Sequence, residues 1–267
     1  MNMVVLVKHV PDAQIDRHLT GAGNTISREH SILSELDEYP LEAALQLAEA
    51  RGGEAAGNKV TAVTMGPAGA VAAVKKALQM GAYAGVHLSD DALAGSDAAA
   101  TSLALAALIR HLGPVDLVLT GMASTDGETS LVPAQLAARL ELPQITFVSS
   151  LEISSGGGAQ KAVARRDGDT HAETVEALLP ALVSVTDQVN EPRYPNFRGI
   201  MAAKKKKVTT LDLADIGVDA ASVGSAGSWT VVGSAELRPP RTAGTIITDE
   251  GDAGIQLVDF LAAHKLL

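Results

Sequence analysis

Apolar runs alternate with amphipathic stretches along the first 150 residues of the chain. Five short apolar runs, several of them rich in valine, have the pattern of strands that are buried on both faces. Between these runs, apolar residues recur every three or four positions, which predicts helices with one buried side. The predicted strands are 3–7, 59–65, 86–88, 116–120 and 145–148, and the predicted helices are about 40–51, 68–80, 96–112 and 130–140.

The alternation of strands and helices determines the expected fold class. Parallel neighbouring strands need a crossover helix, so the pattern predicts an α/β fold with a doubly wound, mostly parallel sheet. After residue 150 the pattern changes to short, partly alternating segments separated by Gly-Gly-Gly at 156–158 and by Asp-Gly-Asp at 167–169. Such turns predict an antiparallel hairpin insertion. The segments concerned are 151–153, 159–165 and 171–177, and one more buried strand is expected at 181–185.

The C-terminal part of the chain differs in composition from the rest. Residues 217–228 are small and polar, as in a linker, and two prolines at 239–240 precede a final predicted helix at about 254–265. We therefore expect an α/β domain over residues 1–207 and a C-terminal arm over residues 208–267. The arm is expected to pack on another surface, which need not belong to this chain.

The composition and charge of the chain exclude or disfavour several classes of function. The 267 residues include no cysteine, which excludes disulfides, zinc–thiolate sites and iron–sulfur clusters. The net charge of −10 and the scarcity of aromatic residues argue against nucleic-acid binding, which needs a basic face or stacking platforms. No apolar run reaches the length of about 18 residues that a membrane span needs, and the N-terminus lacks the pattern of a signal peptide. We therefore expect a cytoplasmic protein without direct membrane insertion.

The segment G-M-A-S-T-D-G-E-T-S-L-V at 121–132 is the most informative one for ligand binding. It follows the fourth predicted strand, and open parallel sheets bind ligands beyond the carboxyl ends of their strands, at a switch point of the topology. A helix expected from about Ser130 would direct backbone N–H groups toward an anion such as phosphate. The alternative is an ordinary loop in which Thr129 or Ser130 caps the helix. The segment is not a G-x-x-x-x-G-K-[ST] loop, and no G-x-G-x-x-G follows the first strand, which disfavours a phosphate-loop hydrolase and an ordinary dinucleotide dehydrogenase.

Catalytic patterns are scarce in the sequence. The seven histidines show no metal-ligand spacing such as H-E-x-x-H, and there is no G-x-S-x-G elbow. The acidic pairs at 90–91 and 167–169 fit turns better than paired catalytic carboxylates. We therefore expect no metal site and no catalytic residues of the chain's own, so that it is not itself an enzyme.

The stretch N-E-P-R-Y-P-N-F-R-G-I-M-A-A-K-K-K-K at 190–207 combines prolines, aromatics and basic residues. Its two prolines predict an irregular loop, and Tyr194 and Phe197 are two of only seven aromatic residues in the chain. One interpretation is a solvated loop with a basic face. We favour a protein-docking loop, because an exposed aromatic beside arginines and lysines suits an acidic protein partner.

These segments together resemble the β subunit of the electron transfer flavoproteins. The most specific match is L-L-P-A-L-V-S-V-T-D-Q-V-N-E-P-R-Y-P-N-F-R-G-I-M-A-A-K-K-K-K at 178–207. Supporting matches are V-K-H-V-P-D at 7–12, M-G-P-A-G-A-V-A-A-V-K-K-A-L-Q-M-G-A at 65–82, S-T-D-G at 124–127 and P-P-R-T-A-G at 239–244. The resemblance runs from Val4 to the end of the chain.

The resemblance implies a Rossmann-like fold of the adenine nucleotide α-hydrolase-like type and a heterodimer. The α subunit would carry most contacts to a redox-active FAD, whereas the β subunit would hold a structural AMP in residues 1–207 and pack its arm against α. Such a pair collects electrons from dehydrogenases, including the acyl-CoA dehydrogenases of fatty acid oxidation. It delivers them to the respiratory chain through a membrane electron transfer flavoprotein–quinone oxidoreductase.

The resemblance also assigns site residues. Asp126 is expected to order its loop, because its negative charge would not favour a phosphate. Phe197 stands where the family has a bulky apolar anchor. The implied AMP-binding residues are Leu6, Ser34, Leu36, Asp37, Met65, Gly121, Ser124, Thr125, Asp126, Gly127, Thr129, Ser130, Leu131 and Val132, and the implied partner-docking residues are Tyr194, Phe197, Arg198, Ile200, Met201, Lys204 and Lys205.

Three departures from the family pattern leave alternatives open. Ala13 stands where some members have a tyrosine near the flavin, and Ser34 replaces an asparagine. The loop S-T-D-G-E-T resembles D-G-D-T of bifurcating relatives, whose β subunit binds a second FAD in place of AMP. A further alternative is a stand-alone adenine-nucleotide-binding protein of the universal-stress type, although the G-x-x-G-x(9)-G-[ST] motif of that class does not follow the fourth predicted strand.

Overall fold

The computed structural model describes the chain except for residues 21–23, 157 and 237. It divides into two compact units, residues 1–232 and residues 233–267.

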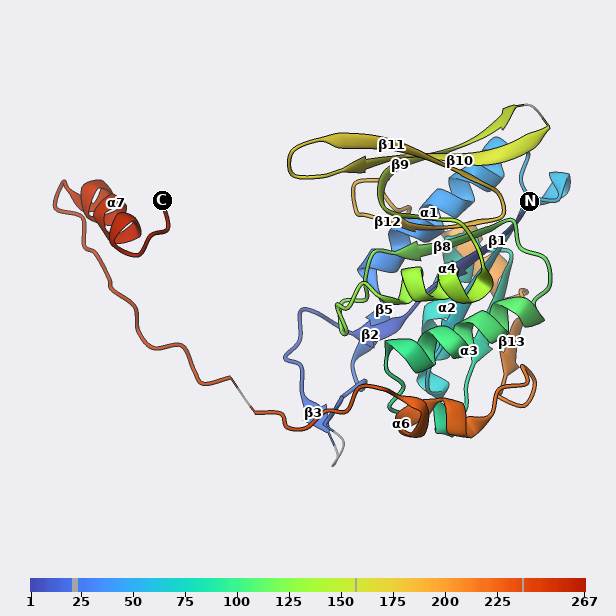
Figure 1. Ribbon diagram of the computed structural model, residues 1–267, viewed down its shortest axis with the longest axis horizontal. Helices are drawn as coiled ribbons and strands as arrows, with labels where there is room; N and C mark the ends of the chain where they lie inside the picture. The colour runs from blue at the N-terminus through green and yellow to red at the C-terminus, as the bar shows by residue number, and fades with distance from the viewer. Residues whose placement is uncertain (21–23, 157, 237) are drawn as a thin grey trace. The chain divides into compact units, whose positions relative to one another are not determined.

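In the described part of the first unit, nine strands form one sheet in the order β11-β10-β9-β12-β8-β1-β6-β7-β13 (Figure 1). From β12 to β13 all neighbouring strands are parallel, and β9, β10 and β11 form the predicted antiparallel insertion at one edge. The predicted strands 145–148 and 151–153 are one continuous strand, β9, which first pairs with β12 and then with β10. The strands are β1 Asn2–Leu6, β6 Lys59–Met65, β7 Ala84–Leu88, β8 Leu117–Gly121, β9 Gln144–Gly156, β10 Ala159–Asp167, β11 Ala172–Leu178, β12 Ala181–Val185 and β13 Val208–Leu211.

Helices cover both faces of this sheet, as the doubly wound prediction requires. Met3 and Val5 of β1 contact the layer of α1 and α2, whereas Val4 contacts the layer of α3 and α4, which lies in front of the sheet in Figure 1. The fold is thus mixed α/β with a large, mostly parallel sheet, and the Rossmann-like classification stays a prediction. The helices are α1 Glu35–Ala50, α2 Val71–Met80, α3 Ala98–His111, α4 Val132–Leu140, α5 Phe197–Ala203, α6 Gly224–Gly227 and α7 Ala253–Ala263, with 3₁₀ turns η1 Glu54–Ala56, η2 Ala68–Ala70, η3 Asp91–Leu93 and η4 Ala220–Ser222.

Helix α1 begins five residues before its predicted start near residue 40. The first turn carries Glu35, Asp37 and Glu38, whose negative charges favour a helix N-terminus. Pro40 therefore lies inside the helix, not at its start. The segment before α1 forms two small antiparallel ladders, in which β2 (His9–Pro11) pairs with β5 (Ser31–Leu33) and β3 (Leu19–Thr20) pairs with β4 (Thr25–Ile26).

Two expectations about the C-terminal third differ from the structure. The first unit continues to residue 232, past the predicted boundary after residue 207, because β13 pairs with β7 and because Leu213 and Val223 are buried. The small residues taken for a linker allow close packing: a Cβ added at Gly224 would lie 2.0 Å from the carbonyl oxygen of Ala92. The predicted irregular loop at 190–207 contains helix α5, which begins only after the second proline and whose N-terminus is capped by Asn196.

The second unit contains helix α7 near its predicted position, and none of its described residues is buried. Ile255, Leu257, Val258 and Phe260 on this helix are all exposed. No helix in the described parts of the chain is long and apolar enough to cross a membrane.

The two boundaries make different predictions for truncated chains. A chain that ends at Val232 should keep the unfolding free energy of the first unit, because none of the described residues among 233–267 is buried. A chain that ends at Lys207 should lose about 3 kcal/mol or more, since burial of an aliphatic side chain such as Leu213 or Val223 contributes about 1.5–3 kcal/mol each. Urea unfolding followed by circular dichroism measures both values, and equal stabilities of the two truncated chains would contradict the boundary at residue 232.

Candidate functional site

The switch point of the sheet lies between β1 and β8. From β1 the chain adds β6 and β7 on one side, and α3 then returns it to β8 on the other side of β1. The loops that follow β1 and β8 therefore diverge at the same edge, which leaves a crevice in doubly wound sheets. This is the crevice that the sequence predicts for the segment 121–132.

Asp126 is the best-connected residue of this loop. Its carboxylate accepts from Lys8 Nζ at 2.8 Å and from a guanidinium nitrogen of Arg28 at 2.8 Å, and its side chain is only 3% exposed. Lys8 Nζ also donates to Ser124 Oγ at 3.3 Å, and the backbone N–H of Gly127 donates to Asp126 Oδ1. Burial alone would raise the pKa of Asp126, but the charges and hydrogen bonds of Lys8, Ser124 and Arg28 outweigh it and hold the pKa well below its usual range.

These contacts support the loop-ordering role expected of Asp126 and add two residues to the site. Lys8 lies two residues after β1, so its place beyond the carboxyl end of a buried strand was a signal available in the sequence. Arg28 lies in the polar segment before α1 and 98 residues from Asp126 along the chain, and it has no local signal. Arg28 also donates to the carbonyl oxygen of His9, which ties this segment to the start of β2.

Asp37 is a second carboxylate beside Lys8, with the opposite pKa shift. It lies in the first turn of α1, is buried, and accepts from the backbone N–H of Lys8 at 2.7 Å. Burial raises the pKa of Asp37 to about 7, against the backbone hydrogen bond and the positive charge of Lys8, and the charge of Asp126 raises it further. A Cβ added at Gly121 would lie 2.6 Å from the carbonyl oxygen of Leu36 and 2.9 Å from Asp37 Oδ1, so the end of β8 approaches α1 as only glycine allows.

Ser34 precedes α1 with an unpaired hydroxyl group. Its backbone N–H donates to the carbonyl oxygen of Lys8, but its buried Oγ has no hydrogen-bond partner among the described residues and does not cap the helix. A buried hydroxyl without a partner costs free energy, which a bound ligand with a polar atom could recover. The acidic first turn of α1 disfavours a phosphate at this end of the helix and leaves a neutral donor or acceptor as the matching group.

Helix α4 begins at Val132, and neither Thr129 nor Ser130 caps it. Leu131 occupies the cap position and makes no side-chain cap hydrogen bond, so the expectation that Thr129 or Ser130 caps the helix is wrong. Glu128 and Ser130 have φ angles of 50° and 53°, a left-handed conformation that non-glycine residues adopt at a cost and that often occurs in ligand-binding loops. The uncapped N–H groups of α4 are suited to an anion.

The predicted AMP-binding residues thus come from the carboxyl ends of β1, β6 and β8 and from the start of α1. Contacts join Leu36 and Asp37 to Gly121, and Lys8 joins Asp37 to the loop that contains Ser124 and Asp126. As nucleotide contacts, all fourteen stay predictions. Among the described residues, no hydrogen bond or close approach joins the other seven to this cluster: Leu6, Met65, Thr125, Thr129, Ser130, Leu131 and Val132, of which Leu6 and Met65 end neighbouring parallel strands.

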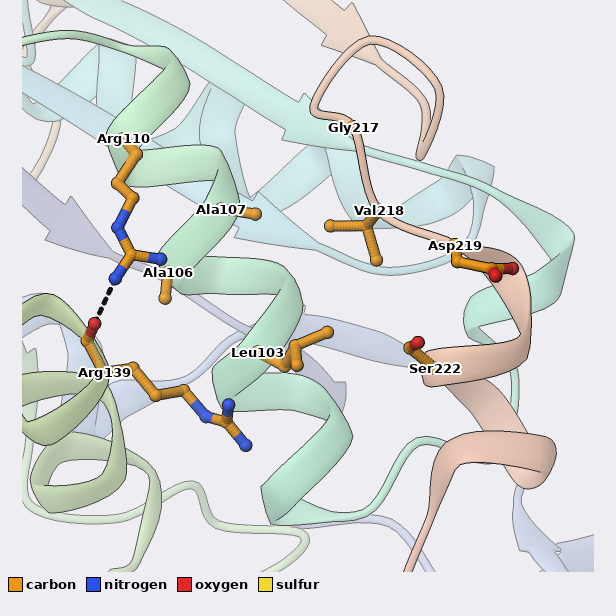
Figure 2. Close-up of a pocket in the computed structure, with 9 residues that line it drawn as sticks. All are labelled: Leu103, Ala106, Ala107, Arg110, Arg139, Gly217, Val218, Asp219 and Ser222. Carbon is orange, nitrogen blue, oxygen red and sulfur yellow. Dashed lines mark hydrogen bonds between the residues drawn. The ribbon is translucent and has the colours of Figure 1, made fainter.

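A cavity of about 440 Å³ lies elsewhere, between α3 and residues 217–222 (Figure 2). Two arginines line it, but both are used to join helices: Arg110 donates to the carbonyl oxygen of Arg139, and Arg139 donates to Ser102 Oγ and to the carbonyl oxygen of Ala99. None of the described buried polar atoms that lack a partner lies among its lining residues. The crevice at the switch point is therefore the better candidate site. No group of three His, Asp or Glu side chains suited to a metal occurs among the described residues.

The docking element, residues 190–207, presents its predicted residues on the surface. Tyr194 and Phe197 are 88% and 80% exposed, and Met201 is 44% exposed. Of the remaining predicted residues, Arg198, Lys204 and Lys205 are exposed and Ile200 is half-buried. Lys206 differs from the other lysines of the run, because it donates to the carbonyl oxygens of Gly81 and Ala82 just after α2.

Comparison with known proteins identifies the family. The electron transfer flavoprotein domain matches residues 24–216. The chain is 44% identical over 268 residues to the electron transfer flavoprotein subunit beta of Mycobacterium leprae, with 100% of this chain and 99% of the relative covered. It is 43% identical, with the same coverage, to the subunit of the same name from Mycobacterium tuberculosis. It is also 36% identical over 250 residues to the caffeyl-CoA reductase-Etf complex subunit CarD of Acetobacterium woodii, with 93% of this chain and 92% of the relative covered. The chain belongs to the electron transfer flavoprotein family and is similar over its whole length to the β subunits of that family.

Proposed function

We propose that this chain is the β subunit of a heterodimeric electron transfer flavoprotein and binds AMP in the crevice between β1 and β8. The α subunit would hold the FAD. The pair would carry electrons in the cytoplasm from dehydrogenases, such as acyl-CoA dehydrogenases, to a membrane quinone oxidoreductase and the respiratory chain. The observation that carries this proposal is that the loop ordered by Asp126 meets the start of α1 at the switch point of the sheet.

The chemistry of the crevice supports AMP as the nucleotide. The uncapped N-terminus of α4 and the two cations Lys8 and Arg28 suit one phosphate group, and the unpaired hydroxyl of Ser34 suits a polar atom of the base or the ribose. FAD is the second candidate, because the likeness to a subunit of a caffeyl-CoA reductase-Etf complex and the S-T-D-G-E-T loop favour a bifurcating-type β subunit with its own flavin.

Replacement of Asp126 by alanine tests the nucleotide site. Lys8 and Arg28 would lose their shared partner, and we expect a loss of about 2 kcal/mol in stability, less than for a fully buried pair because both cations are partly exposed. Retained AMP should fall with it, since ligand binding and folding are linked. Nucleotide extraction and chromatography of the purified heterodimer measures the occupancy.

Asp167→Ala is the matched control, because Asp167 pairs with Arg165 on the exposed hairpin and not in the crevice. Full AMP occupancy in Asp126→Ala would contradict the assignment of the loop. Stoichiometric FAD in the chain expressed without its α subunit would favour the bifurcating alternative.

Asp37 predicts a specific pH dependence of stability. Its pKa is raised to about 7 in the fold, so its contribution is fully present below its ordinary pKa near 4 and is lost as the pH rises through about 7. Asp37→Asn keeps a neutral side chain at every pH. Relative to the wild type, the variant should therefore gain about 3 kcal/mol between pH 5 and pH 8, because the change amounts to about 1.4 kcal/mol per pH unit from pH 5 to about 7 and then stops. Urea unfolding at the two pH values measures this difference, and a constant difference would show that Asp37 is charged throughout.

Phe197→Ala tests the docking element. Truncation of a buried aromatic anchor commonly costs about 2 kcal/mol or more, which corresponds to roughly thirtyfold weaker binding. We therefore expect a roughly thirtyfold rise in the flavoprotein concentration needed for half-maximal reduction by an acyl-CoA dehydrogenase, with FAD and AMP contents unchanged.

Replacement of Lys204 and Lys205 by neutral glutamines should instead lower the rate of association with the dehydrogenase and flatten the salt dependence of that rate.

Leu178→Ala is the control for Phe197→Ala, because Leu178 is an exposed apolar residue outside the docking element. An unchanged apparent affinity of Phe197→Ala would leave residues 190–207 as a solvated connection between β12 and β13.

The exposed apolar residues of α7 support packing of the C-terminal arm on the α subunit. An apolar helix without a buried residue in its own unit needs another surface to cover it. The folded chain that ends at Val232 would then fail to form a stable heterodimer, which size-exclusion chromatography after co-expression with the α subunit detects.

A further inference from the structure

Arg193 joins the start of the docking element to helix α1 through two carboxylates. Its Nε and Nη2 donate to Glu42 at 2.7 and 3.0 Å, and its Nη1 and Nη2 donate to Glu49 at 2.5 and 3.0 Å. Its backbone N–H also donates to Glu42 Oε2 at 3.2 Å. Such bidentate contacts fix the orientation of a guanidinium group as well as its distance, which a lysine ammonium group cannot reproduce. We call Arg193, Glu42 and Glu49 the Arg193 clamp.

The two carboxylates of the clamp lie in different environments. The side chain of Glu42 is 4% exposed, whereas that of Glu49 is 58% exposed. Burial alone would raise the pKa of Glu42, but the hydrogen bonds from Arg193 and Gln46 outweigh it and lower the pKa. A buried ion pair adds little net stability compared with apolar residues, because desolvation offsets the attraction. The orientation that the clamp imposes therefore explains it better than its contribution to stability does.

A second contact fixes the same segment to α1. Asn190 Nδ2 donates to the carbonyl oxygen of Tyr39 at 3.0 Å. The two ends of N-E-P-R at 190–193 are thus both attached to one helix.

The exposed aromatics lie directly after the clamp and have little packing of their own. Tyr194 and Phe197 are almost fully exposed, and only Pro195 and Asn196 separate them. On the other side, α5 rests on α2 at Gly199, where an added Cβ would lie 2.4 Å from the carbonyl oxygen of Gln79. The positions of the two aromatics therefore depend on the Arg193 clamp at one end and on α5 at the other.

We propose that Arg193 is a positioning residue for partner docking, which holds Tyr194 and Phe197 in the orientation that the partner binds. Preorganisation of this kind raises affinity because side chains that are already ordered lose less conformational entropy on binding. Arg193 itself need not touch the partner. The inference rests on the proposed docking function of residues 194–205 and goes beyond it by naming what orients them.

A double-mutant cycle on the heterodimer tests the proposal. We expect Arg193→Ala to raise the flavoprotein concentration for half-maximal reduction by an acyl-CoA dehydrogenase about tenfold, with the rate at saturation unchanged, since binding must then order the two aromatics. Arg193→Ala combined with Phe197→Ala should weaken binding by less than the product of the two single effects, because part of the effect of Arg193 passes through Phe197 and only the part through Tyr194 remains.

Arg193→Lys separates positioning from charge. Lysine keeps the positive charge but cannot form both bidentate contacts, so this variant should be weakened like Arg193→Ala. Wild-type affinity of Arg193→Lys would overturn the proposal in favour of electrostatic steering. Multiplied effects in the double variant would also overturn it. If Phe197→Ala alone has no effect, the docking function itself fails, which is a different result from failure of the Arg193 variants only.

Glu49→Gln is a second variant that tests the clamp if the Arg193 variants do not fold. Loss of Arg193 could unfold the protein because it leaves the buried Glu42 unpaired. Glu49 is exposed, so its neutralisation removes half of the clamp without leaving a buried charge. We expect a weakening of about threefold with no change in melting temperature or AMP content, since half of the ordering is lost. Wild-type affinity of Glu49→Gln would count against the clamp.

Discussion

Burial of both faces of the central strands is the constraint on which the rest of the structure depends. All five residues of β8 and all five of β12 are buried, and helices cover the sheet on both sides. Neither face of these strands can hold charged groups at low cost, so polar chemistry is confined to their ends and to the loops that follow. The crevice between β1 and β8 is where two such ends diverge, and the candidate nucleotide site lies there.

The charges at that crevice are not matched one to one. The ammonium group of Lys8 and the guanidinium group of Arg28 both contact Asp126, whereas Asp37 accepts from the backbone N–H of Lys8. Asp126 consequently keeps its negative charge at all ordinary pH values, whereas the pKa of Asp37 rises to about 7. The same lysine thus supports a permanent charge that orders the loop and a buried carboxyl group that changes its charge near neutral pH.

Helix α1 connects this crevice to the docking element. Its first turn supplies Leu36 and Asp37 to the crevice, and its later turns supply Glu42 and Glu49 to the Arg193 clamp. One rigid helix therefore fixes the candidate nucleotide site and the start of the proposed docking surface relative to each other. Loops placed by such a scaffold can carry function without a core of their own.

The sequence by itself determined most of the elements of the central sheet and its covering helices, and the family. The bounds of β6 match the prediction, most other strands and helices differ from it by a few residues, and the N-E-P-R segment and its neighbours led to the family that the comparisons confirm. The prediction of these elements succeeded because the spacing of apolar residues shows which side of a single helix or strand is buried.

Only the tertiary structure decided which distant residues meet. Asp126 pairs with Lys8 and Arg28 across 118 and 98 residues, and the first unit extends to residue 232 because Leu213 and Val223 pack into its core. Arg193 and Glu42 are likewise 151 residues apart. Contacts over such separations leave no periodicity in either segment, so they follow from the packing of the sheet and its helices and not from local pattern.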